Sequence, residues 1–263
     1  MTSGVDFRLD GRVAIITGGS TGIGLGIAEA MAQAGASVVI AARRPDVVDE
    51  ACQAIASQGG AAVGIPTDVS DSEQVHRLVG NTREKLGRID ILVNNAGGTF
   101  GPTFKRGPLL EMDDADFEEC WAVNVKSAFM CSKAAVPHMM EGGNGSIINI
   151  SSVSGRENTA PMVGFSAYGS AKSALIGLTR GMSVEWAPAV RANVIAAGMI
   201  DTPRVTASRA GDDMSAWLQT IAMGRAGLPV DVAGAAVFLA SDAASWMTGS
   251  CIDIHGGLKR SVS

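Results

Sequence analysis

Residues 13–24 read VAIITGGSTGIG, an apolar β-branched run followed directly by a glycine-rich turn. The run over Val13–Thr17 predicts a buried strand. The pattern from Gly22 to Ala34 predicts an amphipathic helix, which Gly35 ends as a glycine just past a helix C-terminus does. A glycine motif alone is a weak indication, but its place between the first strand and the first helix makes this one strong. The stretch therefore predicts a strand–turn–helix unit in which the backbone can approach a ligand closely.

The same alternation of strand and helix continues along the chain. Further strands are expected over Ser37–Ala42, Ala61–Pro66, Ile89–Asn94, Ser146–Ser151, Ala192–Ala196 and Cys251–Ile254, and helices over Pro45–Ser57, Ser70–Leu86, Asp114–Met140 and Ser166–Trp186. Strands this continuously apolar are covered on both faces, as in parallel sheets. We therefore expect an α/β protein with a single doubly wound parallel sheet, the Rossmann fold. No linker or repeat interrupts the pattern, so one domain is expected over residues 1–263, with short ends near 1–8 and 259–263.

The composition argues against several classes of protein. The chain of 263 residues carries a net charge of −5 and no run of Lys or Arg, so we expect no nucleic-acid and no membrane partner. The four cysteines and three histidines are scattered without the spacing of metal ligands, so no metal site is expected. Neither a signal peptide nor an apolar run of bilayer length is evident, and scattered cysteines fit a reducing compartment. These features predict a cytoplasmic protein.

Tyr168 is the only tyrosine of the chain and stands four residues before Lys172, so the two side chains share one helix face. Reduction of a carbonyl needs an acid at the developing alkoxide, and oxidation of an alcohol needs the same group as a base. To poise a tyrosine near neutral pH, its pKa must fall by roughly 3, which is about 4 kcal/mol. A cation at about 4 Å supplies on the order of 4 kcal/mol at an effective dielectric constant near 20. We therefore expect Lys172 to make Tyr168 a proton donor and acceptor.

Further motifs stand in a recognisable order. Asn94–Gly97 reads NNAG, Asn193–Gly198 reads NVIAAG, and Met247–Gly257 reads MTGSCIDIHGG. Together with the G-x-x-x-G-x-G turn, this order resembles the classical short-chain dehydrogenase/reductase family from about Leu9 to Gly257, with His255 where aspartate is common. The resemblance implies an NAD(P)-dependent oxidoreductase that transfers a hydride between a nicotinamide and a ketone or secondary alcohol.

The resemblance also implies a catalytic tetrad of Asn124, Ser152, Tyr168 and Lys172. In it Ser152 donates a hydrogen bond to the substrate oxygen, and Asn124 holds a water molecule linked to the lysine. Ser151 is the alternative to Ser152, and Asn124 could instead be an ordinary polar residue of its helix. The stretch between Ser152 and Tyr168 has 15 residues, which is longer than is usual in the family, so substrate analogy is weaker than chemical analogy.

The cofactor is expected along the carboxyl ends of the first strands. An NAD-selective site places an acid at the end of the second strand, where this chain has Arg43 and Arg44 instead. Arg43 could pair with a 2′-phosphate, so NADP(H) is favoured and NAD(H) stays possible, although both arginines could simply be solvated. Asp68 resembles the residue that contacts adenine and could instead cap the following helix. The expected cofactor-binding residues are Gly18, Ser20, Thr21, Gly22, Ile23, Gly24, Arg43, Asp68, Val69, Asn95, Ala96, Gly97, Tyr168, Lys172, Gly198, Ile200 and Thr202, with Thr202 at the carboxamide.

The substrate pocket is expected between Gly98–Pro108, Arg156–Phe165 and Met199–Gly224, where the last stretch has the pattern of a lid. The apolar side chains expected to line this pocket, which could equally be core residues, are Met162, Phe165, Met199, Met214 and Trp217. They favour a small-molecule, moderately hydrophobic substrate, steroid-like or a small carbonyl. Glu157-Asn158 and Ala243–Trp246 are similar to bacterial 7α-hydroxysteroid dehydrogenases, while the general body is equally like 3-oxoacyl-thioester reductases of fatty-acid type.

Two further expectations concern the whole protein. A catalytically idle dinucleotide-binding sensor or scaffold is the alternative of another class, but it would need the glycine turn and not the tetrad. Members of the family are usually tetramers built on the two long helices, so a homotetramer is expected. Small residues on the second of these helices, Gly169, Ala171, Ala174 and Gly177, would permit close helix approach, or they could pack on the sheet.

Overall fold

The protein is described by a computed structural model, over residues 4–99, 101, 104–156, 163–208 and 215–258. Seven strands form one sheet in the order β3-β2-β1-β4-β5-β6-β7, and every neighbouring pair is parallel. The strands are β1 (Val13–Thr17), β2 (Ser37–Ala42), β3 (Ala61–Pro66), β4 (Ile91–Asn94), β5 (Gly145–Ser152), β6 (Val190–Ala197) and β7 (Cys251–Ile254). Their order reverses between β1 and β4, which is the switch point of a doubly wound fold.

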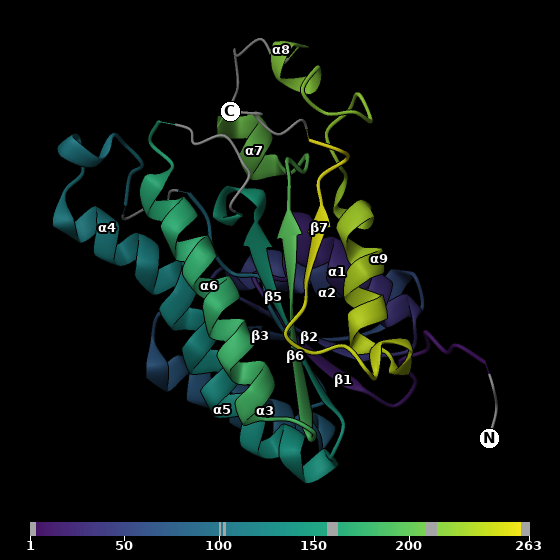
Figure 1. The fold of residues 1–263 in the computed structure, drawn as a ribbon. Coiled ribbons are helices and arrows are strands. Elements are labelled where there is room, and N and C mark those ends of the chain that lie inside the picture. Colours follow the sequence, from purple (N-terminus) through teal and green to yellow (C-terminus); the bar gives the residue numbers. More distant parts are fainter. Residues whose placement is uncertain (1–3, 100, 102–103, 157–162, 209–214, 259–263) are drawn as a thin grey trace.

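Helices cover both faces of this sheet (Figure 1). One face carries α1 (Gly22–Gln33), α2 (Pro45–Ser57) and α9 (Pro229–Ala240), and the other carries α3 (Ser72–Leu86), α5 (Ser127–Gly142) and α6 (Ser166–Glu185). The predicted doubly wound Rossmann fold is confirmed.

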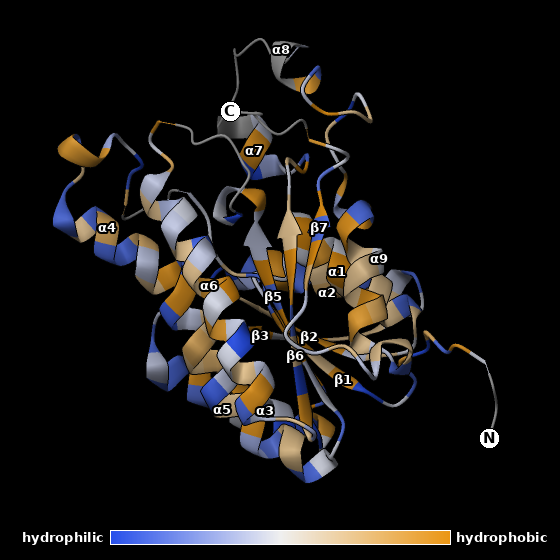
Figure 2. Ribbon diagram, viewed as in Figure 1, coloured by the Kyte–Doolittle hydropathy of each residue, from blue (hydrophilic) through white to orange (hydrophobic). Residues whose placement is uncertain are grey.

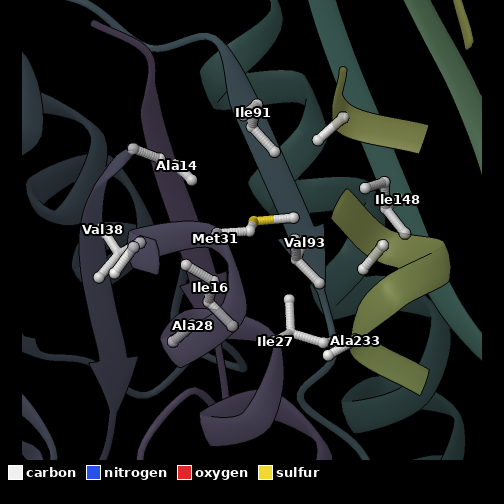
Figure 3. Close-up of a cluster of buried hydrophobic side chains, with 14 of the residues drawn as sticks. Ala14, Ile16, Ile27, Ala28, Met31, Val38, Ile91, Val93, Ile148 and Ala233 are labelled. Carbon is white, nitrogen blue, oxygen red and sulfur yellow. The ribbon is translucent and has the colours of Figure 1, made fainter. Parts of the chain in front are cut away.

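The two cores follow from the alternation of side chains along each strand. Ala14 and Ile16 of β1 pack with α1 and α9, whereas Val13 and Ile15 pack on the opposite face. Figure 3 shows the first core, in which Met31 of α1 lies among side chains of the central strands. Both faces of the sheet are therefore covered mainly by apolar side chains, with Asn149, Arg191 and Asn193 as buried polar residues within β5 and β6.

The start of α3 differs from the prediction. The helix begins at Ser72 and not at Ser70, because Asp71 is its cap: the Asp71 carboxylate accepts hydrogen bonds from the backbone N–H groups of Glu73 and Gln74 at 2.8 and 3.2 Å. Asp68 instead accepts from the backbone N–H and hydroxyl of Ser70 at 3.0 and 2.7 Å. Asp68 therefore holds a turn and does not cap the helix.

The long helix expected over Asp114–Met140 is interrupted. It consists of α4 (Asp114–Trp121), a π-helical turn η2 (Ala122–Lys126) and α5, which ends at Gly142. The wider turn lies around Asn124, and such π turns often accompany functional residues.

Residues 229–240 form α9, for which the sequence analysis assigned no element. Figure 2 shows why: α9 is apolar around most of its surface, so it lacks the polar stripe that marks an amphipathic helix. The stretch Met199–Gly224, expected to be a lid, contains two short helices, α7 (Pro203–Ser208) and α8 (Ser215–Leu218). Within the described parts of the chain, no helix has the length and apolar character to cross a membrane.

Candidate active site

The glycine turn lies against the N-N-A-G segment at the switch point of the sheet. Gly18 has a φ of +62°, and a Cβ atom there would meet the Asn95 amide nitrogen at 2.9 Å. A Cβ on Gly24 would collide with the Gly18 carbonyl oxygen. Asn95 donates from its amide to the carbonyls of Thr17 and Gly18, both at 3.0 Å. Only glycine fits at positions 18 and 24, and the turn is held in one shape.

The beginning of α1 suits a negatively charged ligand. Thr21 precedes the helix, its hydroxyl makes no capping hydrogen bond, and the first turn contains no acidic residue. Ser20 is half-buried and Thr21 exposed. The partial positive charge of the helix N-terminus, with its unpaired N–H groups, is therefore available to the phosphates of a dinucleotide. This donor set fits the nicotinamide cofactor that the sequence predicts.

The adenosine end of such a cofactor would lie beyond β2 and β3. Arg43 follows the last residue of β2 directly and is exposed, and it forms no ion pair with any of the described residues. Val69 is buried in the second core. Asp68 has one carboxylate oxygen engaged by Ser70. The end of β2 therefore presents a cation where an NAD-selective site presents an acid.

Tyr168 and Ser152 are brought together by α6 and the end of β5. The Tyr168 phenol lies beside the Ser152 hydroxyl, which acts to lower the pKa of Tyr168, and the Ser152 oxygen accepts a hydrogen bond from the backbone N–H of Ser154 at 3.1 Å. Ser151 points the other way, and its hydroxyl donates to the Lys172 carbonyl at 2.9 Å. Of the two serines, the structure brings Ser152 to the tyrosine, while Ser151 fastens α6 to the sheet.

The Lys172 ammonium is buried beneath this pair. It donates to the Ile150 carbonyl at 2.9 Å and lies 5.6 Å from the centre of the Tyr168 ring. Lys172 is only 4% exposed, and this burial lowers the pKa of Lys172 to about 8. The ammonium is thus poorly hydrated and close to losing its proton at physiological pH.

The structure shifts the pKa of Tyr168 in the direction opposite to the one expected from the sequence. Burial raises the pKa of Tyr168 above its usual value, and the Ser152 hydroxyl offsets only part of that increase. The apolar neighbours of its ring include Phe104, Cys120 and Ala167. The argument from the sequence assumed that the Lys172 ammonium lies next to the Tyr168 hydroxyl, whereas in the structure it donates its hydrogen bond to the Ile150 carbonyl. Lowering this pKa therefore needs more positive charge than Lys172 alone provides.

Asn124 forms hydrogen bonds that hold the loop after the N-N-A-G segment. Its amide donates to the Gly98 and Cys120 carbonyls at 2.9 Å each, and its carbonyl oxygen accepts from the Gly98 N–H at 3.1 Å. A Cβ on Gly97 would lie 2.5 Å from the Asn124 oxygen and 3.3 Å from the Lys172 ammonium. Asn124, Gly97 and Lys172 therefore meet, and the water relay that the resemblance implies for Asn124 stays a prediction.

The beginning of the lid closes over the glycine turn. A Cβ on Gly22 would lie 3.1 Å from the Thr202 methyl group. Ile200 pairs with Gly227 in an isolated bridge, and its side chain is buried in the first core. Gly198 packs against His255. Arg204 of α7 donates to the Gly97 carbonyl at 2.7 Å.

The substrate side is described only in part. Phe165 lies edge-on to the Tyr168 ring at 6.3 Å, with the Arg106 guanidinium 4.9 Å from the Phe165 centroid. Met199 is half-buried. Among the expected pocket residues, Met162, Met214, Glu157 and Asn158 lie outside the described residues, as does the side chain of Trp217.

The segment Ala243–Trp246 lies away from this site. It includes the turn η4 (Asp242–Ala244) and precedes β7, so it lies at the amino edge of the sheet, and Trp246 is 99% exposed. Its similarity to hydroxysteroid dehydrogenases therefore says nothing about the pocket at the carboxyl edge.

Several positioning residues were not predicted from the sequence. The Thr17 hydroxyl accepts from the backbone N–H groups of Asn95 and Ala96 at 3.0 and 3.1 Å. A buried chain of amides runs from Asn94 to Asn149 and on to Thr179 of α6, with both hydrogen bonds at 2.8 Å. Polar residues at the ends of otherwise apolar runs were the available signal. Within the described residues, no cluster of His, Cys, Asp and Glu could hold a metal ion.

Known proteins are similar to this chain over almost its whole length. Residues 18–259 match the family model described as enoyl-(acyl carrier protein) reductase. An uncharacterized oxidoreductase of Mycobacterium tuberculosis is 42% identical over 96% of this chain and 94% of its own length. The 7α-hydroxysteroid dehydrogenase of Clostridium sardiniense is 36% identical over 95% and 94% of the two chains.

Solved structures are similar over the full length as well. A 7α-hydroxysteroid dehydrogenase complexed with NADH and 7-oxo glycochenodeoxycholic acid has a TM-score of 0.90 at 35% identity, with 100% of both chains covered. A protein from Beutenbergia cavernae, described as a "putative NAD(P) dependent gluconate 5-dehydrogenase" with NADP bound at low occupancy, has a TM-score of 0.87 at 36% identity. The match covers 96% of this chain and 98% of that one.

Proposed function

Because this chain belongs to the short-chain dehydrogenase/reductase family and is an NAD(P)-dependent oxidoreductase, we propose that it transfers a hydride between the nicotinamide and a ketone or secondary alcohol. The observation that carries the proposal is the placement of Tyr168 beside Ser152 and above the buried Lys172 ammonium. This pair offers two hydroxyl groups to one substrate oxygen. A catalytically idle sensor or scaffold would have no use for that arrangement.

The protein's own residues would handle the proton. Ser152 donates a hydrogen bond to the substrate oxygen and stabilises the charge that develops there. Tyr168 gives its proton to that oxygen in reduction and takes it back in oxidation. Lys172 holds positive charge beneath the ring, and Asn124 keeps the Gly97–Gly98 backbone against that lysine. A bound nicotinamide would supply or accept the hydride, and its oxidised ring would add positive charge that counteracts the raised pKa of Tyr168.

We propose NADP(H) as the preferred cofactor, with NAD(H) as the alternative. The support is Arg43, an exposed cation directly after β2 without an ion pair among the described residues. A guanidinium matches the geometry of a 2′-phosphate, whereas it adds little to recognition of a 2′-hydroxyl. The glycine turn and the beginning of α1 would hold the phosphates that both cofactors share.

For the substrate we propose a free, moderately hydrophobic ketone or secondary alcohol, steroid-like or a small carbonyl. The apolar neighbours of Tyr168, together with Phe165 on its open edge, support this class. The name of the 7α-hydroxysteroid relative points in the same direction. An acyl thioester is the second candidate, favoured by the description of the matching family model.

The experiment that tests hydride transfer uses NADPH and NADH with deuterium at both C4 positions, together with a panel of steroid, acyl-thioester, sugar and small-ketone substrates. The expected result is an alcohol that has gained one deuterium on the former carbonyl carbon, formed faster with NADPH. Oxidation of the cofactor without deuterium in any product would contradict the proposal. Deuterium in a saturated acyl chain would indicate an enoyl reductase instead.

We also propose the homotetramer expected from the sequence, with α4 and α5 at a subunit contact. A hollow of about 820 Å³ on this outer face is lined by residues that include Phe117, Trp121 and Phe129. Of the small residues on α6, Ala171 is buried and Gly169 lies against Ser154, whereas Gly177 is exposed and Ala174 half-buried, so these last two are open to a partner helix. A second copy with the same apolar face would cover the phenylalanines. The cytoplasmic location stays a prediction from the sequence.

A further inference from the structure

Arg204 connects the beginning of α7 to the N-N-A-G segment. Its guanidinium donates a hydrogen bond to the carbonyl of Gly97, the last residue of that segment, at 2.7 Å. Thr202, two residues earlier, lies beside the glycine turn, since a Cβ atom on Gly22 would lie 3.1 Å from its methyl group. The short segment from Thr202 to Arg204 therefore joins the glycine turn to the N-N-A-G segment.

The root of this segment is anchored to the body of the protein. The backbone N–H of Asp201 donates to the Gly227 carbonyl at 2.7 Å, and the Gly227 N–H donates to the Met199 carbonyl at 2.9 Å. The Thr206 hydroxyl then donates to the Asp201 carboxylate at 2.9 Å. These contacts hold the beginning of α7 in place, and Arg204 lies in an exposed position there.

Two groups of the candidate site act electrostatically on Arg204, the Arg43 guanidinium and the Tyr168 phenol. Loss of hydration lowers the pKa of Arg204, and the positive charge of Arg43 lowers it further, while Tyr168 acts in the opposite direction. Arg204 is therefore within electrostatic reach of both Arg43, at the adenosine end, and Tyr168, at the nicotinamide end. A dinucleotide that runs from one to the other has its pyrophosphate between them.

We propose that Arg204 binds the pyrophosphate of the dinucleotide and so fastens α7 over the bound cofactor. The proposal rests on the nicotinamide cofactor of the proposed function. The Gly97 carbonyl is a neutral acceptor, whereas a phosphate oxygen accepts a charge-assisted hydrogen bond that is roughly twice as strong. A phosphate would also relieve the repulsion between Arg204 and Arg43. Arg204 exchanges the carbonyl for the phosphate when the cofactor enters.

The test measures dissociation constants of NADPH, NADH and adenosine 2′-monophosphate for Arg204→Met and Arg204→Lys. Arg204→Met should weaken NADPH and NADH alike, by roughly 10- to 100-fold, because the lost hydrogen bond is to a charged group that both share. Binding of adenosine 2′-monophosphate, which has no pyrophosphate, should stay unchanged. Arg204→Lys should restore part of the affinity, since it keeps the charge without the two-pronged geometry.

Arg77→Met on the exposed side of α3 is the matched control and should bind both dinucleotides as the wild type does. An effect of Arg204→Met on NADPH alone would assign Arg204 to the 2′-phosphate, and unchanged dinucleotide binding with a raised substrate KM would assign it to the substrate. Either result overturns the proposal. Failure of the wild type to bind any dinucleotide would instead overturn the cofactor assignment itself.

Discussion

Lys172→Met should change how the stability of the protein depends on pH. Lys172 is 4% exposed, and its pKa in the folded protein is about 8, against 10.5 for an ordinary lysine. Below pH 8 both the folded and the unfolded chain hold the proton, so the buried charge destabilises the fold without any pH dependence. Between about pH 8 and 10.5 the folded protein has released the proton while the unfolded chain still binds it, so stability rises with pH.

The size of that rise follows from the two pKa values. The gap between 10.5 and about 8 corresponds to about 3 kcal/mol of unfolding free energy, most of it gained by pH 10. Methionine fills similar volume and does not titrate. The free energy of unfolding of the wild type minus that of Lys172→Met should therefore increase by about 3 kcal/mol over this range.

Urea unfolding of both proteins at several pH values from 7 to 10, at one protein concentration, measures this difference. Burial raises the pKa of each of the four thiols in the folded protein, which adds its own pH dependence, but the thiols are common to both proteins. Cys120 is the exception because it acts electrostatically on Lys172, so the comparison is repeated with Cys120→Ser in both chains. Lys85→Met, at an exposed position of α3, should give a difference that does not change with pH. A flat or falling difference for Lys172→Met would refute the reasoning.

Three further variants test other parts of the site. Arg43→Ala should raise the dissociation constant of NADPH by roughly 10- to 100-fold and leave that of NADH nearly unchanged; equal effects in a binding titration would rule out the 2′-phosphate contact. Ser152→Ala should lower kcat by on the order of 10²-fold, whereas Ser151→Ala should leave kcat unchanged and cost only about 1 kcal/mol of stability. If steady-state kinetics showed the loss of kcat in Ser151→Ala instead, Ser151 and not Ser152 would be the catalytic serine. Phe129→Glu, in the hollow on α4 and α5, should reduce the oligomer to smaller species by light scattering, and an unchanged mass would argue against a contact on this face.

The fold could be predicted because its signals are local. β-branched runs mark β1, β2 and β5, Gly35 ends α1 with a φ of +105°, and Pro45 begins α2. The helix α9 escaped prediction since it is apolar almost all round and packs against α1 and the sheet. A periodicity argument detects one polar face, and α9 has none to detect.

The candidate site was predictable in its residue types and less so in its geometry. The order of motifs placed Ser152, Tyr168 and Lys172 in one site, where the structure has them together. The direction of the Lys172 ammonium depends on the Ile150 carbonyl, a backbone group that leaves no mark in the sequence. The reach of Arg204 to Gly97 joins residues 107 positions apart, so only the folded chain reveals it.

Tyr168→Phe tests the central claim most directly, because it removes one hydroxyl and leaves the ring in place. With the substrate found in the panel, kcat should fall by about 10² to 10⁴-fold, the range of a lost general acid and base. The dissociation constant of the preferred dinucleotide should change by no more than about tenfold, since at most one neutral hydrogen bond is lost. Turnover of Tyr168→Phe at the wild-type rate would contradict the assignment of Tyr168 as the proton donor and acceptor.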